Sequence, residues 1–226
     1  MTRLAKILIT GTAMLTLTLS SAYADGSNNT QNSGGQSTIL NGQVNFNTQQ
    51  ATLTINANEV QGNVSGGAVA GGNALDVTTM NNTDVQSEQY VSSVNIEADT
   101  NANISNVAGT TDLQSQAVCN SASISMDPTS TNVNSNQECN ATDPAAIMHA
   151  NVSNTLNDVS IASSAVGNTM EEDTNAPYGT VTNNQINHSA VNAVTTANTL
   201  NVGGNLTASA SAIGNTAQIV HYSTTP

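Results

Sequence analysis

The sequence repeats itself at intervals of 47 and 48 residues along most of its length. The stretch at residues 197–216 reads ANTLNVGGNLTASASAIGNT. Three upstream stretches align with it without a gap: residues 150–169, 102–121 and 55–74. A fixed period of roughly 20 to 50 residues is typical of solenoids, propellers and other arrays, in which each unit buries its apolar face against its neighbours. The repeat extends from about residue 41 to about residue 220, so it constrains the fold of nearly the whole chain.

Three columns of this alignment hold one residue type in all four units. They are Asn56, Asn103, Asn151 and Asn198; Ala70, Ala117, Ala165 and Ala212; and Asn73, Asn120, Asn168 and Asn215. Upstream of them, the alignment assigns Val44, Val91, Cys139 and Ile186 to one further column. The composition, with only 2% aromatic residues, would by itself allow disorder. A disordered chain gives no reason to keep such columns in register, so they indicate a folded repeat domain.

Apolar and polar residues alternate within the units, and a period of two is that of a β-strand. Leu53, Ile55 and Ala57 alternate with polar residues, and the same alternation occurs at residues 206–212. Glycine pairs mark turns, and no stretch combines an N-cap with an apolar stripe of helical spacing. The sequence therefore predicts an all-β fold, a narrow β-solenoid (β-helix) built from four repeats of about 47 residues.

The interior columns are small, with Ala as frequent as Val, so the layers that the strands enclose are expected to be thin. This favours two coils of about 24 residues in each unit, stacked about 4.8 Å apart. Two stretches interrupt the pattern and are predicted to be loops outside the stack. Residues 123–144 contain two prolines and both cysteines, and residues 170–178 contain a run of three acids.

Two interpretations of the Asn columns fit the sequence. Stacked Asn side chains can form a ladder in which each amide donates to one neighbour and accepts from the other. Asn also tolerates the left-handed backbone of turns, and Asn73, Asn168 and Asn215 each follow a glycine. For the Ala column, the alternation with Ser and Thr predicts that its side chains face the interior.

The first 24 residues have the organisation of a secretory signal peptide. Arg3 and Lys6 precede an apolar run, and Ala22-Tyr23-Ala24 is a small-residue cleavage triplet. The predicted organisation is a signal peptide at 1–24, a flexible polar linker at 25–38, the β-solenoid repeat domain at 39–222 and a C-terminal tail at 223–226. Export to an oxidising compartment favours a disulfide between Cys119 and Cys139. Their separation of 20 residues is close to one proposed coil, so stacking of coils would bring them together.

The charge limits the partners that the chain can bind. Removal of the signal peptide would remove both basic residues and change the net charge from −13 to about −15. A chain without Lys or Arg cannot neutralise phosphates, so nucleic acid is not expected as a partner. The absence of Lys also leaves the strand edges at both ends of a solenoid without a common block against association. We therefore expect copies to associate end to end.

The sequence carries no motif that predicts catalysis. HExxH, GxSxG and phosphate-binding loops are absent. His149, His188 and His221 are too scattered to suggest a metal site, and Glu171, Glu172 and Asp173 fit a solvated loop better than a calcium site. Lyases that act on acidic sugars need a cationic group, which the mature chain lacks. We expect neither an enzyme nor a cofactor.

The repeats resemble those of secreted bacterial repeat proteins of the functional-amyloid and surface-anchor type. The endings SAVGNT and SAIGNT at residues 164–169 and 211–216 are similar to the holdfast-anchor group, and GNVSGGAVAGGNAL at residues 62–75 resembles a Fap-type or curlin-like repeat. The resemblance implies an exported structural protein at the outer cell surface, without a cofactor, that acts in adhesion or biofilm. Its implied partners are further copies of itself, other surface repeat proteins, exopolysaccharide and an outer-membrane export pore. A soluble polysaccharide-binding module is the alternative.

Overall fold

The computed structural model describes residues 37–222 except residues 81, 128–129 and 177, and it describes no side chains for residues 93, 94 and 130. The predicted signal peptide, most of the predicted linker and the C-terminal tail lie outside the described residues. The described part of the chain forms ten strands and no helix, so it has no helix that could cross a membrane. The strands are β1 (Ser37–Asn45), β2 (Gln49–Val60), β3 (Val64–Thr79), β4 (Thr83–Val107), β5 (Thr111–Met126), β6 (Ser130–Thr155), β7 (Val159–Thr174), β8 (Tyr178–Asn187), β9 (Asn192–Val202) and β10 (Leu206–His221).

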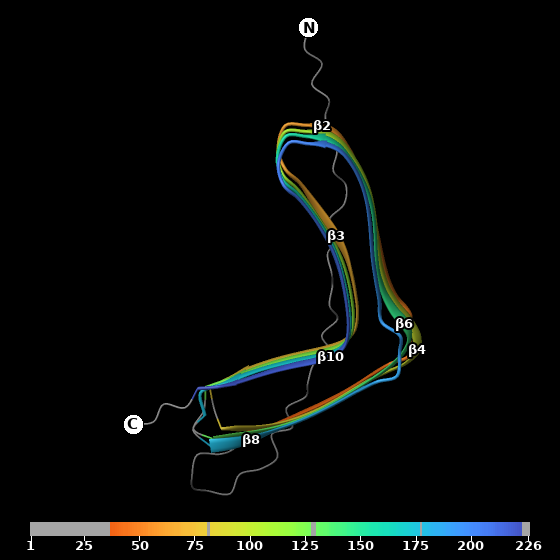
Figure 1. Ribbon diagram of the computed structural model, residues 1–226. Coiled ribbons are helices and arrows are strands. Elements are labelled where there is room, and N and C mark those ends of the chain that lie inside the picture. The colour runs from red at the N-terminus through yellow and green to blue at the C-terminus, as the bar shows by residue number, and fades with distance from the viewer. Residues whose placement is uncertain (1–36, 81, 128–129, 177, 223–226) are drawn as a thin grey trace, which may run out of the picture.

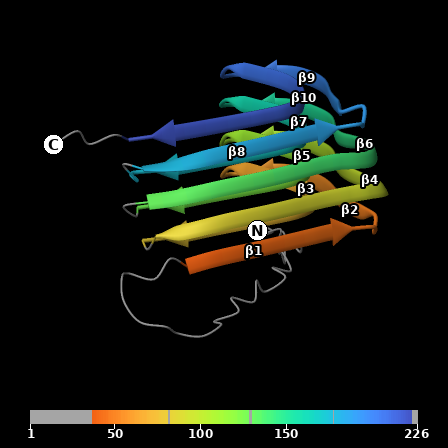
Figure 2. The same ribbon diagram turned by 90° about the horizontal axis from the view of Figure 1, so that it is seen from below.

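Two parallel sheets face each other. The first sheet has the order β1, β4, β6, β8, with β2 also paired to β4 and β9 to β6, and the second sheet has the order β3, β5, β7, β10. Equivalent strands overlie one another in Figure 1 and are seen stacked from the side in Figure 2. The chain thus forms a first layer (β1–β3), a second (β4, β5), a third (β6, β7) and a fourth (β8–β10). This confirms an all-β fold with parallel sheets, consistent with a β-solenoid.

The strand register shows how much chain each layer uses. Residues that pair in neighbouring strands lie 46 to 48 positions apart in the sequence. The prediction of two coils of about 24 residues per unit is therefore wrong. The strands of the first sheet are long, 25 residues in β4 and 26 in β6, and they bend sharply rather than turn back (Figure 1). A complete layer is wide and thin, which accommodates the small interior side chains.

The two stretches expected to be loops are largely strand. β5 extends to Met126 and β6 begins at Ser130, while β7 continues through the acidic run to Thr174. Alternation of buried and exposed residues continues through both stretches. Pro144 fits because the pairing of β4 with β6 is irregular beside it, and a proline is tolerated where the ladder is interrupted. Composition alone misled here, because a proline or an acid does not end a strand whose neighbours hold it.

One predicted column is out of register by one residue. Val44 pairs with Tyr90, and the column continues through Glu138 to Ile186. Cys139 and Val91 instead belong to the column of Asn45 and Asn187. The step between the first and second layers is 46 residues at this place, and the later steps are 48. Because a slip of one residue moves a side chain to the opposite face, Val91 and Cys139 are buried whereas Val44 is exposed.

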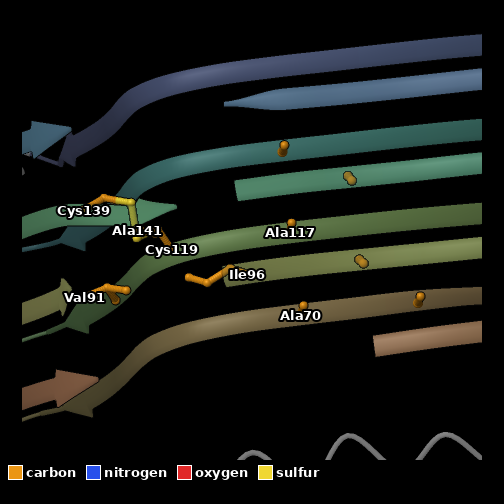
Figure 3. Packing of buried hydrophobic residues seen from close by; sticks show 11 residues of the cluster. Ala70, Val91, Ile96, Ala117, Cys119, Cys139 and Ala141 are labelled. Atoms are coloured by element: carbon orange, nitrogen blue, oxygen red, sulfur yellow. A yellow bond between two sulfur atoms is a disulfide. The ribbon is translucent and has the colours of Figure 1, made fainter. Parts of the chain in front are cut away.

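The core is a thin layer of Ala, Val, Ile and Met between the sheets. One cluster surrounds the Ala column, as Figure 3 shows for Ala70 and Ala117. Ala70, Ala117 and Ala165 are buried, with 3%, 0% and 0% of their surface exposed. The assignment of Ala212 to the interior is wrong, because β10 is exposed along nearly its whole length. Ala212 pairs with Ala165 in register, but no further layer covers it.

Candidate functional site

The inner asparagine ladder connects all four layers through the core. Asn73, Asn120, Asn168 and Asn215 stack in one column of the second sheet. Each Nδ2 donates to the Oδ1 of the next layer, at 2.9, 2.8 and 2.8 Å in chain order. Asn120 and Asn168 are completely buried. None of the four has a positive φ, so of the two interpretations of this column the structure adopts the ladder.

The same amides hold the two sheets together. The second hydrogen of each Nδ2 donates to a main-chain carbonyl of the first sheet in the following layer. The acceptors are the carbonyls of Tyr90, Glu138 and Ile186, at 3.0, 3.0 and 2.8 Å. A buried amide without partners would destabilise the fold, whereas here every layer gains a fixed polar connection across the core.

A glutamine ladder, which the sequence analysis missed, lies opposite in the first sheet. It consists of Gln43, Gln89, Gln137 and Gln185. Each Nε2 donates to the Oε1 of the preceding layer, at 3.1, 2.8 and 2.8 Å, so its donor direction is opposite to that of the inner asparagine ladder. Each also donates to the carbonyl that follows a ladder asparagine. The identity of the four residues was the available signal, but their steps of 46, 48 and 48 do not fit the alignment used.

The outer asparagine ladder is exposed to solvent. Asn56, Asn103, Asn151 and Asn198 stack with Nδ2 to Oδ1 distances of 3.1, 2.9 and 2.9 Å. The role of left-handed turn residue belongs instead to a neighbouring column that the sequence analysis did not identify. Its members Asn106, Asn154 and Asn201 have φ values of 54°, 54° and 55°, and they are also hydrogen-bonded to one another. Asn adopts this conformation more readily than other non-glycine residues.

A shallow groove of about 470 Å³ follows the outer asparagine ladder across the four layers. It is lined by Asn56, Ala57, Asn58, Asn103, Ile104, Ser105, Asn151, Val152, Ser153, Asn198, Thr199 and Leu200. The lining offers amides, hydroxyls and small apolar groups at the spacing of the strands, without a charged or aromatic side chain. This groove can bind an extended neutral chain, and it offers nothing for acid–base catalysis.

The disulfide joins the two sheets rather than two stacked coils. Cys119 in β5 and Cys139 in β6 are both fully buried, and their Cα atoms are 5.9 Å apart. Figure 3 shows the bridge crossing between the strands. In the next layer the equivalent space holds the side chain of Asn187, which would lie 3.0 Å from a Cβ at Gly167. The bridge therefore reinforces the middle of the stack, between the second and third layers.

The acidic run lies on both faces of β7. Glu171 and Asp173 are exposed, whereas Glu172 points inward in a column otherwise formed by Val77, Ile124 and Ile219. Its carboxylate has no hydrogen-bond partner among the described residues. Burial raises the pKa of Glu172, the His221 imidazole lowers it in part, and Asp173 raises it further. The three acids do not converge, and the described residues contain no cluster of three or more His, Cys, Asp or Glu side chains suited to a metal.

The three histidines also stay apart. His149 and His221 are exposed, and His188 lies with its Nε2 3.7 Å from Oε1 of Glu138. This contact is at the surface, where such pairs contribute little to stability.

The fourth layer differs from the others because β10 has neither face covered. Leu206, Ile213 and Ile219 are 47%, 40% and 49% exposed. The free edge of β10 presents unpaired main-chain groups along 16 residues. An apolar strand with an open edge is a template for pairing with another chain.

Stacked parallel strands, internal amide ladders and open ends define a repetitive structural protein. A family model described as HfaD, holdfast attachment protein D, matches residues 92–225. The chain belongs to the holdfast attachment protein D family. Neither the curated proteins nor the solved structures contain a match. The match supports the holdfast-anchor resemblance and not the Fap-type or curlin-like ones, and it indicates a surface adhesion role at an extracellular or cell-surface location.

Proposed function

We propose that this protein is an exported structural subunit of surface attachment that assembles end to end by amyloid-like stacking of its layers. Each of four repeats of about 47 residues supplies one layer, and each added copy extends the same sheets. The product would be a fibre subunit or a holdfast-type anchor. The proposed role is structural rather than enzymatic.

The exposed strand β10 is the observation that carries this proposal. It has the length, register and residue pattern of a buried strand, yet nothing covers it. Proteins that remain monomeric block such edges with Lys, Pro, bulges or a capping element. The described residues of the fourth layer contain no Lys, and β10 contains no Pro.

The proposed partners follow from the same arrangement. Further copies of the chain and other surface repeat proteins can add parallel strands at the ends, and exopolysaccharide can lie on the flanks. An outer-membrane export pore would deliver the chain to the surface. Nucleic acid is not a proposed partner, because the described residues carry no Lys or Arg.

Sedimentation velocity of purified residues 25–226 tests the assembly. We expect the mean mass to rise with protein concentration and thioflavin fluorescence to rise with it. Ionic strength should accelerate assembly by screening the net negative charge. A single monomeric species at the highest soluble concentration and physiological salt would contradict the proposal.

The groove supports a second candidate function, binding of a neutral polysaccharide. Ser153→Glu would place a charge in the groove, and Asn134→Glu would place the same charge on another exposed surface of the third layer. If the groove binds exopolysaccharide, only Ser153→Glu should abolish retention on the immobilised polymer. Equal retention of both variants would reject this candidate.

A further inference from the structure

The amide ladders have a direction, and this direction leaves different groups at the two ends of the stack. In the inner asparagine ladder the donors point toward the fourth layer, where Asn215 Nδ2 donates only to the Gln185 carbonyl at 3.1 Å. One hydrogen of that amide remains available. In the first layer, Asn73 Oδ1 accepts no hydrogen bond from the described residues, although its counterparts in the other three layers each accept one. A donor thus ends one side of the ladder and an acceptor the other.

The glutamine ladder ends in the complementary way. Its donors point toward the first layer, so Gln185 Oε1 accepts nothing from the described residues in the fourth layer. Gln43 Nε2 donates to the Ala74 carbonyl at 2.8 Å and retains a second hydrogen at the first layer. Placing a first layer on a fourth layer joins a donor to an acceptor in both ladders. Placing two fourth layers together would oppose donor to donor at Asn215.

The stagger of the two sheets gives the same polarity. β5 contacts both β4 and β6, and β7 contacts β6 as well as β8 and β9, so each inner strand of the second sheet lies between two layers of the first sheet. β10 contacts β8 and β9 only, within its own layer. At the opposite end, the inward side chains of β2, such as Ala51 and Leu53, are half-buried. The ends therefore have complementary steps, with β10 lacking a first-sheet strand above it and β1 and β2 available to supply one.

The strands of the two terminal layers also correspond. β1 and β8 contain 9 and 10 residues, β2 and β9 contain 12 and 11, and β3 and β10 each contain 16. Both terminal layers divide the first-sheet strand into two, whereas β4 and β6 are continuous. Continuing the register would place like residues over one another, for example Val60 over Val202 and Ala70 over Ala212.

The distribution of charge permits close approach at these ends only. Twelve of the 15 acidic residues lie between residues 84 and 173, and the sequence from residue 178 onward contains none. Within the first layer the acids are Glu59 and Asp76, which in continued register would face Asn201 and Gln218. No pair of like charges would stack at the junction.

We propose that a second copy of this chain docks with its first layer on the fourth layer of the preceding copy, parallel and in continued register, so that the assembly is a polar filament. This inference rests on the proposed end-to-end assembly and specifies its geometry. Asn215 donates to Asn73 and Gln43 donates to Gln185 across each junction, and β10 becomes covered by β1 and β2 of the next copy.

Two variants with one blocked end each test the polarity. Ala212→Arg places a cation on the exposed inward face of β10, and Ala51→Arg places one on the half-buried inward face of β2. In the free protein a long arginine can extend past the open edge to water, whereas in the junction it would be buried without a partner. The matched controls are Ser211→Arg and Thr52→Arg, whose side chains point outward beside the blocked positions. Circular dichroism establishes that all four variants retain the fold.

We expect each blocked variant to sediment as a monomer by itself, and the equimolar mixture to give a species of twice the monomer mass and nothing larger. The controls should assemble like the unchanged protein. If either blocked variant forms a dimer by itself, or if the mixture stays monomeric while the unchanged protein assembles, the polar arrangement is wrong but the proposed assembly survives. If the unchanged protein does not assemble, both proposals fail.

A charge-reversal pair then tests the register. Gln218→Glu would face Asp76 of the next copy and should weaken association at low salt, and adding Asp76→Lys in the same chain should restore it. Restoration absent at low salt would contradict continued register, because no other arrangement required here brings these positions together.

Discussion

Strands β7 and β10 are neighbours in the second sheet, have 16 residues each and pair in register, but their surroundings differ completely. β7 is buried along most of its length, whereas β10 is exposed on both faces. The two strands even share the ending Ser-Ala-aliphatic-Gly-Asn-Thr. Burial in a stacked fold is therefore set by the presence of the next layer, and a sequence pattern alone does not reveal whether that layer exists.

The two strands also differ in charge. β7 carries Glu171, Glu172 and Asp173, and the positions paired with them in β10 are Gln218, Ile219 and Val220. The acidic side chains belong to strands that are already covered within the monomer. The strand left open is uncharged apart from any protonation of His221, which is the composition expected of a surface that receives another layer.

The largest expected difference concerns the Ala column. Ala165→Glu would bury an unpaired charge and should lower the free energy of unfolding by roughly 3–5 kcal/mol. Ala212→Glu should change it by less than about 0.5 kcal/mol in dilute monomer, because the side chain remains in water. Urea denaturation of both variants measures this difference. Similar losses in the two variants would mean that β10 is covered in the monomer.

The disulfide sharpens the comparison between the middle of the stack and its end. Replacing both Cys119 and Cys139 by Ser should lower the free energy of unfolding by about 3 kcal/mol, mainly because the bridge restricts the unfolded chain. The fourth layer has no covalent connection among its described residues, so it should lose hydrogen-exchange protection first in either protein. Mass spectrometry under non-reducing conditions verifies the bridge, and two free thiols in exported protein would refute it.

The inner asparagine ladder gives a smaller but equally direct contrast. Asn168→Leu removes three hydrogen bonds and leaves the Asn120 amide and the Ile186 carbonyl without their partner, at an expected cost of roughly 2–3 kcal/mol. Asn215→Leu should cost less than about 1 kcal/mol, since water replaces the lost contacts at an exposed position. Thermal unfolding at low protein concentration measures both, and comparable destabilisation would show that the exposed ladder end is as constrained as its middle.

The sequence predicted those features that repeat identically and missed those that depend on context. The asparagine and alanine columns were visible because residues such as Asn120 and Ala117 recur at a nearly constant step. The glutamine ladder escaped because its first step is 46 residues, and a one-residue shift places Gln89 in the wrong column. Ala212 was misplaced because alternation specifies the inward face of a strand but not what covers that face. The width of a layer could not be inferred either, since a bend in β4 leaves no mark in its alternation.

The smallest expected effect concerns Glu172, which occupies an aliphatic column. Its side chain is 0% exposed, and burial raises its pKa above the usual 4.5, while His221 lowers the pKa in part and Asp173 raises it further. The folded state therefore holds the proton more tightly than the unfolded state does. Stability from this group is present at pH values below the unfolded pKa and is lost as the pH rises through the folded pKa.

Glu172→Ile should match its column neighbours Ile124 and Ile219 and raise the free energy of unfolding at neutral pH by roughly 1–2 kcal/mol. It should also remove this part of the pH dependence above about pH 4.5. Glu171→Gln, on the exposed face of the same strand, is the control and should leave both quantities nearly unchanged. Urea denaturation at pH 5 and at pH 8, with all three proteins compared, gives the two slopes; a steeper slope in the Glu172→Ile protein would show that the buried carboxylate is stabilised by its surroundings. Because Glu172 is covered by β10 alone, the same measurement also reports whether the last strand is firmly docked in solution.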